Sequence, residues 1–215
     1  MATNNYIPAL KFNWLTKIYD WLISTFMPEK QFKMALINNA AIQNNFNVLD
    51  FGIGTATLSI MAFNNNSQAN YQGIDIDDKI LSIAKQKIQK NNLPIKLIKY
   101  NGGVLPFANE SMDRIITSLV IHHLTDEQKL EAFKEFKRVL KPNGELHIAD
   151  WGKPSNFFMR CCFHLVQFLD GYNTTTSSVN GKLPTIIKNA AFNQVAITHN
   201  FNTVLGTVQI FKVTL

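Results

Sequence analysis

Hydrophobic and polar positions follow two alternating periods through the middle of the chain. Short apolar runs have the length and composition of buried strands, and they lie at 47–52, 71–76, 95–100, 113–121 and 145–150. Between them, apolar residues recur every three or four positions, which is typical of amphipathic helices over 57–63, 78–90 and 126–140. Strands that alternate with helices predict right-handed βαβ units and a mostly parallel sheet in an α/β fold.

The N-terminal part departs from this alternation. Residues 1–45 are predicted to form a helical lid segment, followed by one domain over 46–215. A first helix is expected to end at Pro28, and a second to cover about 30–42. The first helix is marked by apolar residues at every fourth position: Trp14, Ile18, Leu22 and Phe26.

The C-terminal part also changes pattern. Residues 142–144, Pro-Asn-Gly, are expected to turn the chain before the fifth strand. Helices are expected over 156–169 and 183–191. Two strand-like segments, 194–201 and 206–215, then follow with only a short connection, which predicts an antiparallel hairpin at the end of the sheet.

Charge narrows the class of partner. The chain carries 21 lysines and arginines against 15 acidic residues, a formal net charge of +6. Its lysines are scattered and its only arginines are Arg114, Arg138 and Arg160, whereas phosphate-reading proteins rely on arginine. This argues against a nucleic-acid partner. No apolar run reaches the length of a membrane span, so peripheral membrane contact is the most that we expect.

Cysteine usage bounds the cofactors and the compartment. Cys161 and Cys162 are adjacent and are the only cysteines, and neighbouring cysteines rarely meet disulfide geometry. No CxxC metal or redox site is present, so no metal is expected. The N-terminus lacks the basic-then-apolar plan of a signal peptide. We therefore expect a cytoplasmic protein, either a monomer or a homodimer.

The stretch VLDFGIGTA, residues 48–56, carries the first candidate chemistry. A buried run reaches Asp50, and then Gly52 and Gly54 would let backbone approach a ligand while the next helix offers free N–H groups. The carboxyl ends of parallel strands are where open α/β sheets bind ligands. In isolation this motif is weak, because such glycines often only permit a tight turn.

Asp75 gives the loop its meaning. It ends the next strand, where a carboxylate can accept both hydroxyls of a ribose. The other role for an acid there, capping the following helix, falls to Asp77 or Asp78. Thr57 stands where a dinucleotide-binding loop has its third glycine, which argues against a pyrophosphate. S-adenosylmethionine has no phosphate, its ammonium suits Asp50, and its carboxylate suits the N–H groups of the loop.

Four ordered motifs resemble those of class I S-adenosylmethionine-dependent methyltransferases. They are VLDFGIGTATLSI, GIDID, LPFANESMDRIITSLVIHHL and EFKRVLKPNGELHIAD, and they cover about residues 46–151. The resemblance implies a Rossmann-like, doubly wound sheet of seven strands, with the C-terminal hairpin as the sixth and seventh. It also implies methyl transfer from S-adenosylmethionine, with S-adenosylhomocysteine as product.

The resemblance assigns roles in the first loop. Asp50, Gly52, Gly54 and Thr55 would hold the methionine part of the cofactor. Ala56 stands where many relatives have glycine. Because a methyl group is small, we expect a slightly tighter loop that still binds.

The later motifs supply the other cofactor contacts. Asp75 would bind the ribose, and Ile76 would pack on the adenine. Asn101 stands where relatives often have aspartate, and its amide oxygen can accept the same hydrogen bond from the adenine amine. Gly102 would let backbone approach the ring, and Ser118 would line the methionine side.

The catalytic residue is left open by the sequence. Methyl transfer depends chiefly on alignment and desolvation, and a base matters only if the nucleophile must lose a proton. The candidates are His122 and His123 just past the fourth strand, Asp150 at the end of the fifth, and Tyr19 in the lid. For the two histidines, a structural or capping role is favoured over a catalytic one.

Aromatic residues outside the motifs point to a small, apolar or aromatic acceptor, which would be quinone-, phenol- or lipid-like. They are Trp14, Tyr19, Trp21, Phe157, Phe158, Phe163 and Phe168. The alternative is that they are core residues. The segments KIYDWL and RVLKPNGE faintly resemble ubiquinone and menaquinone C-methyltransferases, but the longer signature after Tyr-Asp is missing.

Two other functions stay open. An RNA or DNA methyltransferase is one, although the chain reads SLVIHH where many amino-methylating enzymes have an Asn-Pro-Pro-aromatic clamp. A non-catalytic nucleoside-binding protein on the same fold is the other, since fold alone does not prove turnover.

Overall fold

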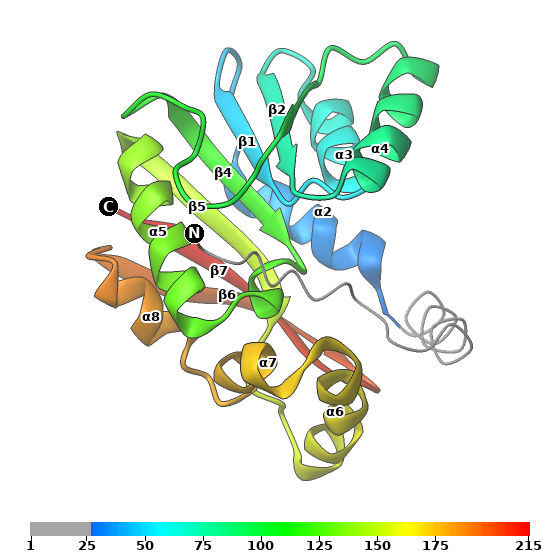
Figure 1. The fold of residues 1–215 in the computed structure, drawn as a ribbon, viewed down its shortest axis with the longest axis vertical. Coiled ribbons are helices and arrows are strands. Elements are labelled where there is room, and N and C mark those ends of the chain that lie inside the picture. Colours follow the sequence, from blue (N-terminus) through cyan, green and yellow to red (C-terminus); the bar gives the residue numbers. More distant parts are fainter. Residues whose placement is uncertain (1–26) are drawn as a thin grey trace.

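A computed structural model describes residues 27–215 (Figure 1). Its centre is a seven-stranded sheet with the order β3-β2-β1-β4-β5-β7-β6. Strands β1 to β5 run parallel, and β7 lies antiparallel between β5 and β6. The strands are β1 Asn47–Phe51, β2 Asn70–Asp75, β3 Lys96–Lys99, β4 Met112–Ser118, β5 Leu140–Trp151, β6 Gln194–Thr203 and β7 Gly206–Thr214. The predicted fold class and the C-terminal antiparallel hairpin are confirmed.

Helices cover both faces of the sheet. Because successive residues of a strand point to opposite faces, neighbouring apolar residues enter two different cores. Val48 and Ile116 pack with α2, α3 and α4 on one face, and Leu49 and Ile115 pack with α5 and α8 on the other. The helices are α2 Glu29–Ala40, α3 Thr57–Asn65, α4 Asp78–Lys90, α5 Asp126–Val139, α6 Phe157–Asp170, α7 Tyr172–Val179 and α8 Leu183–Asn189, with a short 3₁₀ turn, η1, at Ile121–His123.

Local capping explains why α4 and α5 begin where the sequence predicts. The Asp77 carboxylate accepts the N–H groups of Lys79 and Ile80 at the start of α4. Thr125 and Gln128 form a reciprocal capping box at the start of α5. Each cap satisfies helix N–H groups that would otherwise lack a partner, and so fixes the first turn of its helix.

Two predicted boundaries on β4 and β5 are wrong. β4 ends at Ser118 and not at residue 121, because Leu119 has a left-handed backbone (φ +57°) that cannot continue a strand. The Pro142–Gly144 stretch does not separate α5 from β5, because β5 already begins at Leu140. The pairing with β4 is shifted there, so the stretch is an irregularity inside the strand.

Helix α7 is absent from the sequence-based prediction. Its residues, YNTTTSSV, lack apolar periodicity and include five serine and threonine side chains. Three of the threonine hydroxyls bond back to the preceding turn: Thr174 and Thr175 Oγ1 donate to Gly171 O at 3.2 and 2.6 Å, and Thr176 Oγ1 donates to Tyr172 O at 2.6 Å. Such back-bonding satisfies these three hydroxyls inside the helix.

The N-terminal segment is described only from Met27 onward. Helix α2 confirms the expected second helix, and it buries Phe32, Leu36 and Ile37 in the core of the sheet. Arg114 Nε donates to Ala40 O at 2.7 Å and ties the end of α2 to β4. The helix expected before Pro28, with Trp14 and Tyr19, lies outside the described residues, and the domain boundary at residue 45 stays a prediction.

Candidate functional site

The carboxyl ends of β1, β2, β4 and β5 meet along one edge of the sheet. Asp50 in β1 pairs in register with Gly73 of β2 and with Ile116 of β4, and Ser118 pairs with Ala149 of β5. The loops that leave these strand ends therefore lie beside one another. Most of the residues that the sequence predicts as functional fall on this edge.

The loop after β1 is shaped by three residues with left-handed backbone. They are Gly52 (φ +69°), Gly54 (φ +56°) and Ala56 (φ +64°). A Cβ on Gly52 would lie 2.5 Å from a methyl group of Val120, so the loop packs against the segment after β4. Ala56 is buried, and holding an L-residue in this region costs roughly 1–2 kcal/mol. The expectation that only the size of its methyl group matters is incomplete, because backbone strain also accompanies alanine there.

Ile53 fixes this loop to β2. Its N–H donates to Ile74 O at 2.9 Å, and its side chain is buried. A Cβ built on Gly73 would lie 2.1 Å from Ile53 Cδ1, so the isoleucine occupies the place of a side chain on β2. The loop is thus anchored by a main-chain bond and by a side chain in a notch of the sheet.

The Asp75 carboxylate joins β2 to the same loop. Its Oδ2 accepts the Gly54 N–H at 2.9 Å, and its Oδ1 accepts the Asp77 N–H at 3.0 Å. The side chain is half-buried, and the adjacent Ile76 is exposed. A carboxylate held at a strand end beside an exposed apolar side chain can accept hydroxyl groups of a ligand whose ring packs on that side chain.

Asp50 is buried beneath the loop. Its Oδ2 accepts the Ser59 hydroxyl of α3 at 2.7 Å. Burial raises the pKa of this carboxyl to about 6, and the Ser59 hydrogen bond opposes the rise. Burial disfavours the charged carboxylate, and a nearby cation would stabilise it. Asp50 is therefore suited to bind an ammonium group.

The β3 and β4 ends complete the edge. Asn101 and Gly102 are exposed after β3, and a Cβ on Gly102 would meet no atom within 4 Å. Ser118 Oγ at the end of β4 is buried with no hydrogen-bond partner within residues 27–215. Buried polar atoms normally have partners, and a missing ligand is one reason for an exception.

Asp150 anchors the segment after β4. Its Oδ2 accepts the N–H groups of Ile121 and His122 at 2.7 and 3.3 Å, and its Oδ1 contacts His122 Nδ1 at 2.6 Å and accepts the Trp151 N–H at 2.7 Å. Burial raises the pKa of Asp150, but the neighbouring His122 and the Trp151 N–H outweigh this effect, and the pKa is lowered overall. The neighbouring His122 also lowers the pKa of His123, whose side chain is exposed.

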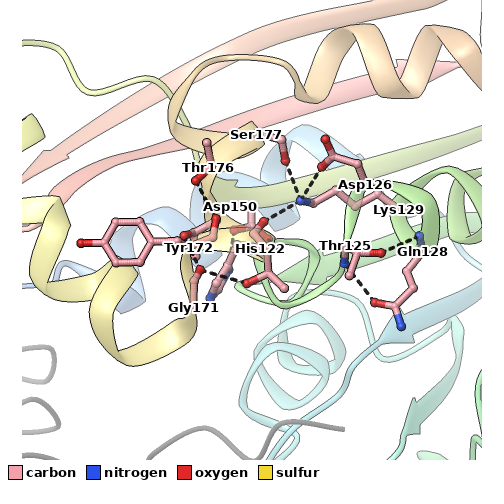
Figure 2. A network of polar contacts seen from close by, with 12 residues as sticks. His122, Thr125, Asp126, Gln128, Lys129, Asp150, Gly171, Tyr172, Thr176 and Ser177 are labelled. Atoms are coloured by element: carbon pink, nitrogen blue, oxygen red, sulfur yellow. Dashed lines mark hydrogen bonds and ion pairs between the residues drawn. The ribbon is translucent and has the colours of Figure 1, made fainter. Parts of the chain in front are cut away.

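A buried lysine extends this polar network to α7 (Figure 2). Lys129 Nζ of α5 donates to Thr174 O and to Ser177 Oγ, each at 2.7 Å, and pairs with Asp126 Oδ1 at 3.3 Å. The lysine side chain is fully buried, and burial lowers its pKa. Figure 2 shows these contacts beside His122 and Asp150, so α7 is tied over the segment after β4.

Comparison with known proteins relates this sequence to methyltransferases. Residues 48–144 match the model of a family described as a methyltransferase domain. The chain contains a methyltransferase domain. A ubiquinone/menaquinone biosynthesis C-methyltransferase of Proteus mirabilis is 25% identical over 95% of this chain and 90% of that protein. A demethylmenaquinone methyltransferase of Listeria welshimeri is 31% identical over 53% of this chain and 48% of that protein, so the chain spans about half the length of this relative.

Solved structures share the fold of this methyltransferase domain. A SAM-dependent methyltransferase from Aquifex aeolicus has a TM-score of 0.66 at 19% identity, and covers 95% of this chain and 100% of that chain. A phosphoethanolamine N-methyltransferase of Haemonchus contortus in complex with S-adenosyl-L-methionine has a TM-score of 0.65 at 18% identity, and covers 80% of this chain and 38% of that chain. The resemblance inferred from the four motifs is confirmed for the domain and the fold.

The structure brings the predicted site residues of the methyltransferase domain to one edge of the sheet. Every predicted cofactor position lies at the carboxyl end of a strand or just after it: Asp50, Gly52, Gly54, Thr55, Asp75, Ile76, Asn101, Gly102 and Ser118. Of the catalytic candidates, His122 and Asp150 contact each other and His123 adjoins them, whereas Tyr19 lies outside the described residues. No group of three His, Cys, Asp or Glu residues in the described part of the chain could hold a metal ion.

The buried position of Lys129 near this edge was not predicted from the sequence. Its spacing carried a signal, because it shares the buried face of α5 with Ala132, Phe133 and Phe136. A lysine at a buried position of a helix indicates a polar partner on the element that covers it. That partner is α7, which the sequence did not predict.

Proposed function

We propose that the chain is a methyltransferase that binds S-adenosylmethionine at the carboxyl edge of β1, β2 and β4. The observation that carries this proposal is the Asp75 carboxylate, held at the end of β2 against the Gly54 N–H. In this position a carboxylate can accept ribose hydroxyls while the loop backbone lies beside it. S-adenosylmethionine supplies an electrophilic methyl group on a sulfonium, and that is the chemistry the site would use.

The other residues at the edge fit the remaining parts of this cofactor. Asp50 has the burial and the raised pKa of a carboxylate that gains most from a cation, so it suits the ammonium group. The first turn of α3 has no side-chain cap among the described residues, which leaves backbone N–H groups for the cofactor carboxylate. Ile76 presents an exposed apolar surface for adenine, and Ser118 Oγ has an unused hydrogen-bond capacity beside the loop.

Methyl transfer asks little proton chemistry of the chain. S-adenosylmethionine, held by Asp50, Asp75 and the loop after β1, would supply a methyl group to the acceptor's nucleophilic atom. The electron pair of the broken carbon–sulfur bond would remain on sulfur. The chain aligns the two and excludes water. His122 is held by Asp150 and suits a positioning role. The pKa of His123 is lowered to about 3, so this side chain is neutral at pH 7 but is a weak base.

The acceptor that we propose is a small apolar or aromatic molecule, such as a quinol or phenol. The relatives named above as quinone-biosynthesis methyltransferases support this class. Of the aromatic side chains predicted to enclose the acceptor, Phe163 is buried in the core against Trp151, and Phe157, Phe158 and Phe168 are exposed on α6. Methylation of nucleic acid and cofactor binding without turnover are the alternatives that the same experiments address.

Cofactor binding is tested with Asp75→Ala in calorimetry with S-adenosylmethionine. We expect at least a tenfold loss of affinity, because two hydroxyl contacts to a charged acceptor are each worth roughly 1.5–3 kcal/mol. Asp78→Ala is the matched control, since its carboxylate is exposed and pairs with Lys99 at 2.8 Å. Equal affinities in the two variants would refute the site.

Turnover is tested by S-adenosylhomocysteine release with quinols, phenols, amines and lipids. We expect release with a quinol or phenol and none with RNA or DNA. Release only with nucleic acid would replace the proposed acceptor. Tight cofactor binding without release for any acceptor would favour the non-catalytic alternative.

A further inference from the structure

Helix α6 presents an apolar face to solvent. The exposed fractions are 83% for Phe157, 68% for Phe158, 39% for Leu165 and 60% for Phe168. These positions, with Cys161, recur at intervals of three and four residues and therefore share one side of the helix. Large apolar side chains gathered on an exposed helix face mark an interaction surface, whereas single ones are ordinary.

The opposite side of α6 is anchored in the protein. Phe163 is buried against Trp151, with ring centroids 5.2 Å apart, and Val166 is buried in the same core. Gln167 Nε2 donates to Thr176 Oγ1 of α7 at 3.2 Å. The inner side of the helix therefore packs against the protein. The outer apolar face is exposed and is not covered by any other element among the described residues.

The charge around this face favours an anionic partner. The excursion from Gly152 to Lys182, which carries α6 and α7, holds three basic residues, Lys153, Arg160 and Lys182, and one acidic residue. A Cβ on Gly181 would lie 3.6 Å from Lys153 Cβ, so both ends of the excursion, with Lys153 and Lys182, lie side by side. The whole chain has a net charge of +6, which acts in the same direction.

We infer that the outer face of α6 docks on the surface of a bilayer that contains anionic lipids. An apolar helix face on a segment with more cations than acids is a combination that lies in the headgroup region, with the apolar side chains among the acyl chains. No helix in residues 27–215 is long and apolar enough to cross a membrane, and interfacial docking needs no such helix. Figure 1 shows α6 with α7 beyond the carboxyl ends of β4 and β5, which is the end of the sheet that carries the candidate site.

The docking is tested by sedimentation with vesicles, without S-adenosylmethionine. Wild-type protein is expected to bind vesicles of equal parts phosphatidylglycerol and phosphatidylcholine, and to bind less as salt rises. Phe157→Ser combined with Phe168→Ser should lower the partition coefficient at least about tenfold. Ile83→Ser combined with Val104→Ser is the matched control, because these residues are 43% and 74% exposed on other elements, and it should bind as wild type.

Two further experiments measure the contribution of the lysines to vesicle binding and the insertion of the α6 face into the bilayer. Lys153→Glu with Lys182→Glu should weaken binding to anionic vesicles, whereas Lys85→Glu with Lys90→Glu on α4 changes the net charge equally and should weaken it less. A solvent-sensitive fluorophore on Cys161, in a Cys162→Ser background, should shift to the blue on vesicles. The same fluorophore at Ser82→Cys, with both native cysteines replaced by serine, should not shift.

Three results would overturn the inference. The first is that the wild-type protein does not bind the anionic vesicles. The second is that the variant with Phe157→Ser and Phe168→Ser binds as well as the wild type. The third is that the chain self-associates through this face and does not bind vesicles. The inference does not depend on methyl transfer. Asp75→Ala, which is expected to lose the cofactor, should still bind the vesicles, so failure of one proposal leaves the other measurable.

Discussion

Backbone conformation shapes the carboxyl edge of the sheet at β1 and β2, whereas buried side-chain hydrogen bonds shape it at β4 and β5. At β1, three residues with positive φ turn the chain, and α3 begins with no side-chain cap among the described residues. At β5, Asp150 accepts from Ile121, His122 and Trp151. One half of the edge keeps hydrogen-bond capacity for a ligand, and the other half uses its capacity internally.

This difference suggests that the two halves of the edge have different roles, one in ligand binding and one in holding the structure in place. A ligand gains most from polar groups that keep hydrogen-bond capacity, such as the half-buried Asp75 carboxylate, whose two oxygens each accept only one N–H group. The buried Asp150 carboxylate has little left to offer, because its two oxygens already contact three backbone N–H groups and His122 Nδ1. We therefore interpret Asp150 as the residue that holds the segment after β4 in place, and the β1–β2 half as the part that recognises the cofactor.

Loss of the framework carboxylate should have the largest effect. Asp150→Ala leaves three buried N–H groups and His122 without their acceptor, and should lower the free energy of unfolding by about 4 kcal/mol. The measurement is urea denaturation at pH 7. Asp78→Ala, which removes an exposed carboxylate, should cost less than about 1 kcal/mol. Similar losses in the two variants would contradict the framework role.

The pH dependence of the Asp150 contribution follows from its lowered pKa. The stabilisation is present above the ordinary carboxyl pKa of 3.8, and it is lost as the pH falls below that value. Asp150→Ala should therefore approach the stability of the wild type only in strong acid. A constant difference down to low pH would assign the effect to packing instead.

Removal of the Asp50 carboxylate in β1 should raise the free energy of unfolding at neutral pH, whereas removal of Asp150 lowers it. The pKa of Asp50 is raised from 3.8 to about 6, so wild-type stability falls as pH rises between these values, because the native state must give up a proton that the unfolded state has already lost. Above pH 6 the cost is about 3 kcal/mol. Asp50→Asn should recover most of it at pH 8 and nothing near pH 3.

The same substitution should weaken cofactor binding. Asparagine can still accept the Ser59 hydroxyl, but it carries no charge for an ammonium group. Thermal denaturation and calorimetry on one preparation measure both effects. A variant that gains stability and keeps full affinity for S-adenosylmethionine would remove Asp50 from the binding site.

The two loop glycines should differ by the smallest amount. Both have positive φ, so alanine at either position should cost roughly 1–2 kcal/mol of backbone strain. Only at Gly52 does the new Cβ also meet Val120, at 2.5 Å, whereas at Gly54 the nearest atom is 3.9 Å away. Gly52→Ala should therefore be less stable than Gly54→Ala by about 1–2 kcal/mol in urea denaturation. An equal loss would mean that strain alone governs the loop.

Sequence reasoning succeeded where the determinants are local. The start of α4 depends on Asp77 and that of α5 on Thr125, and both caps are visible in the sequence. The alternation of strands and helices then gave the α/β class. The positions of Asp50 and Asp75 at strand ends follow from the same local patterns, so their placement at one edge of the sheet was predicted, whereas their role in binding a cofactor stays a proposal.

The missed features depend on contacts between distant segments. Helix α7 is stabilised by its own hydroxyl groups and by Lys129, which lies 45 residues before Thr174. The early start of β5 depends on pairing with β4 across an irregularity. The strain at Ala56 is invisible in the sequence because it arises from the loop geometry. Apart from the buried position of Lys129 on α5, these features leave no periodic signal along the chain.

The notch on Gly73 links two positions that are 20 residues apart. Since Ile53 Cδ1 would lie 2.1 Å from any Cβ at residue 73, a side chain cannot be added at residue 73 while Ile53 keeps its place. A larger residue at 73 requires a smaller one at 53, and the pair should covary among related sequences. Recombination between β1 and β2 from different relatives would break this match, so the loop and the strand should be inherited together.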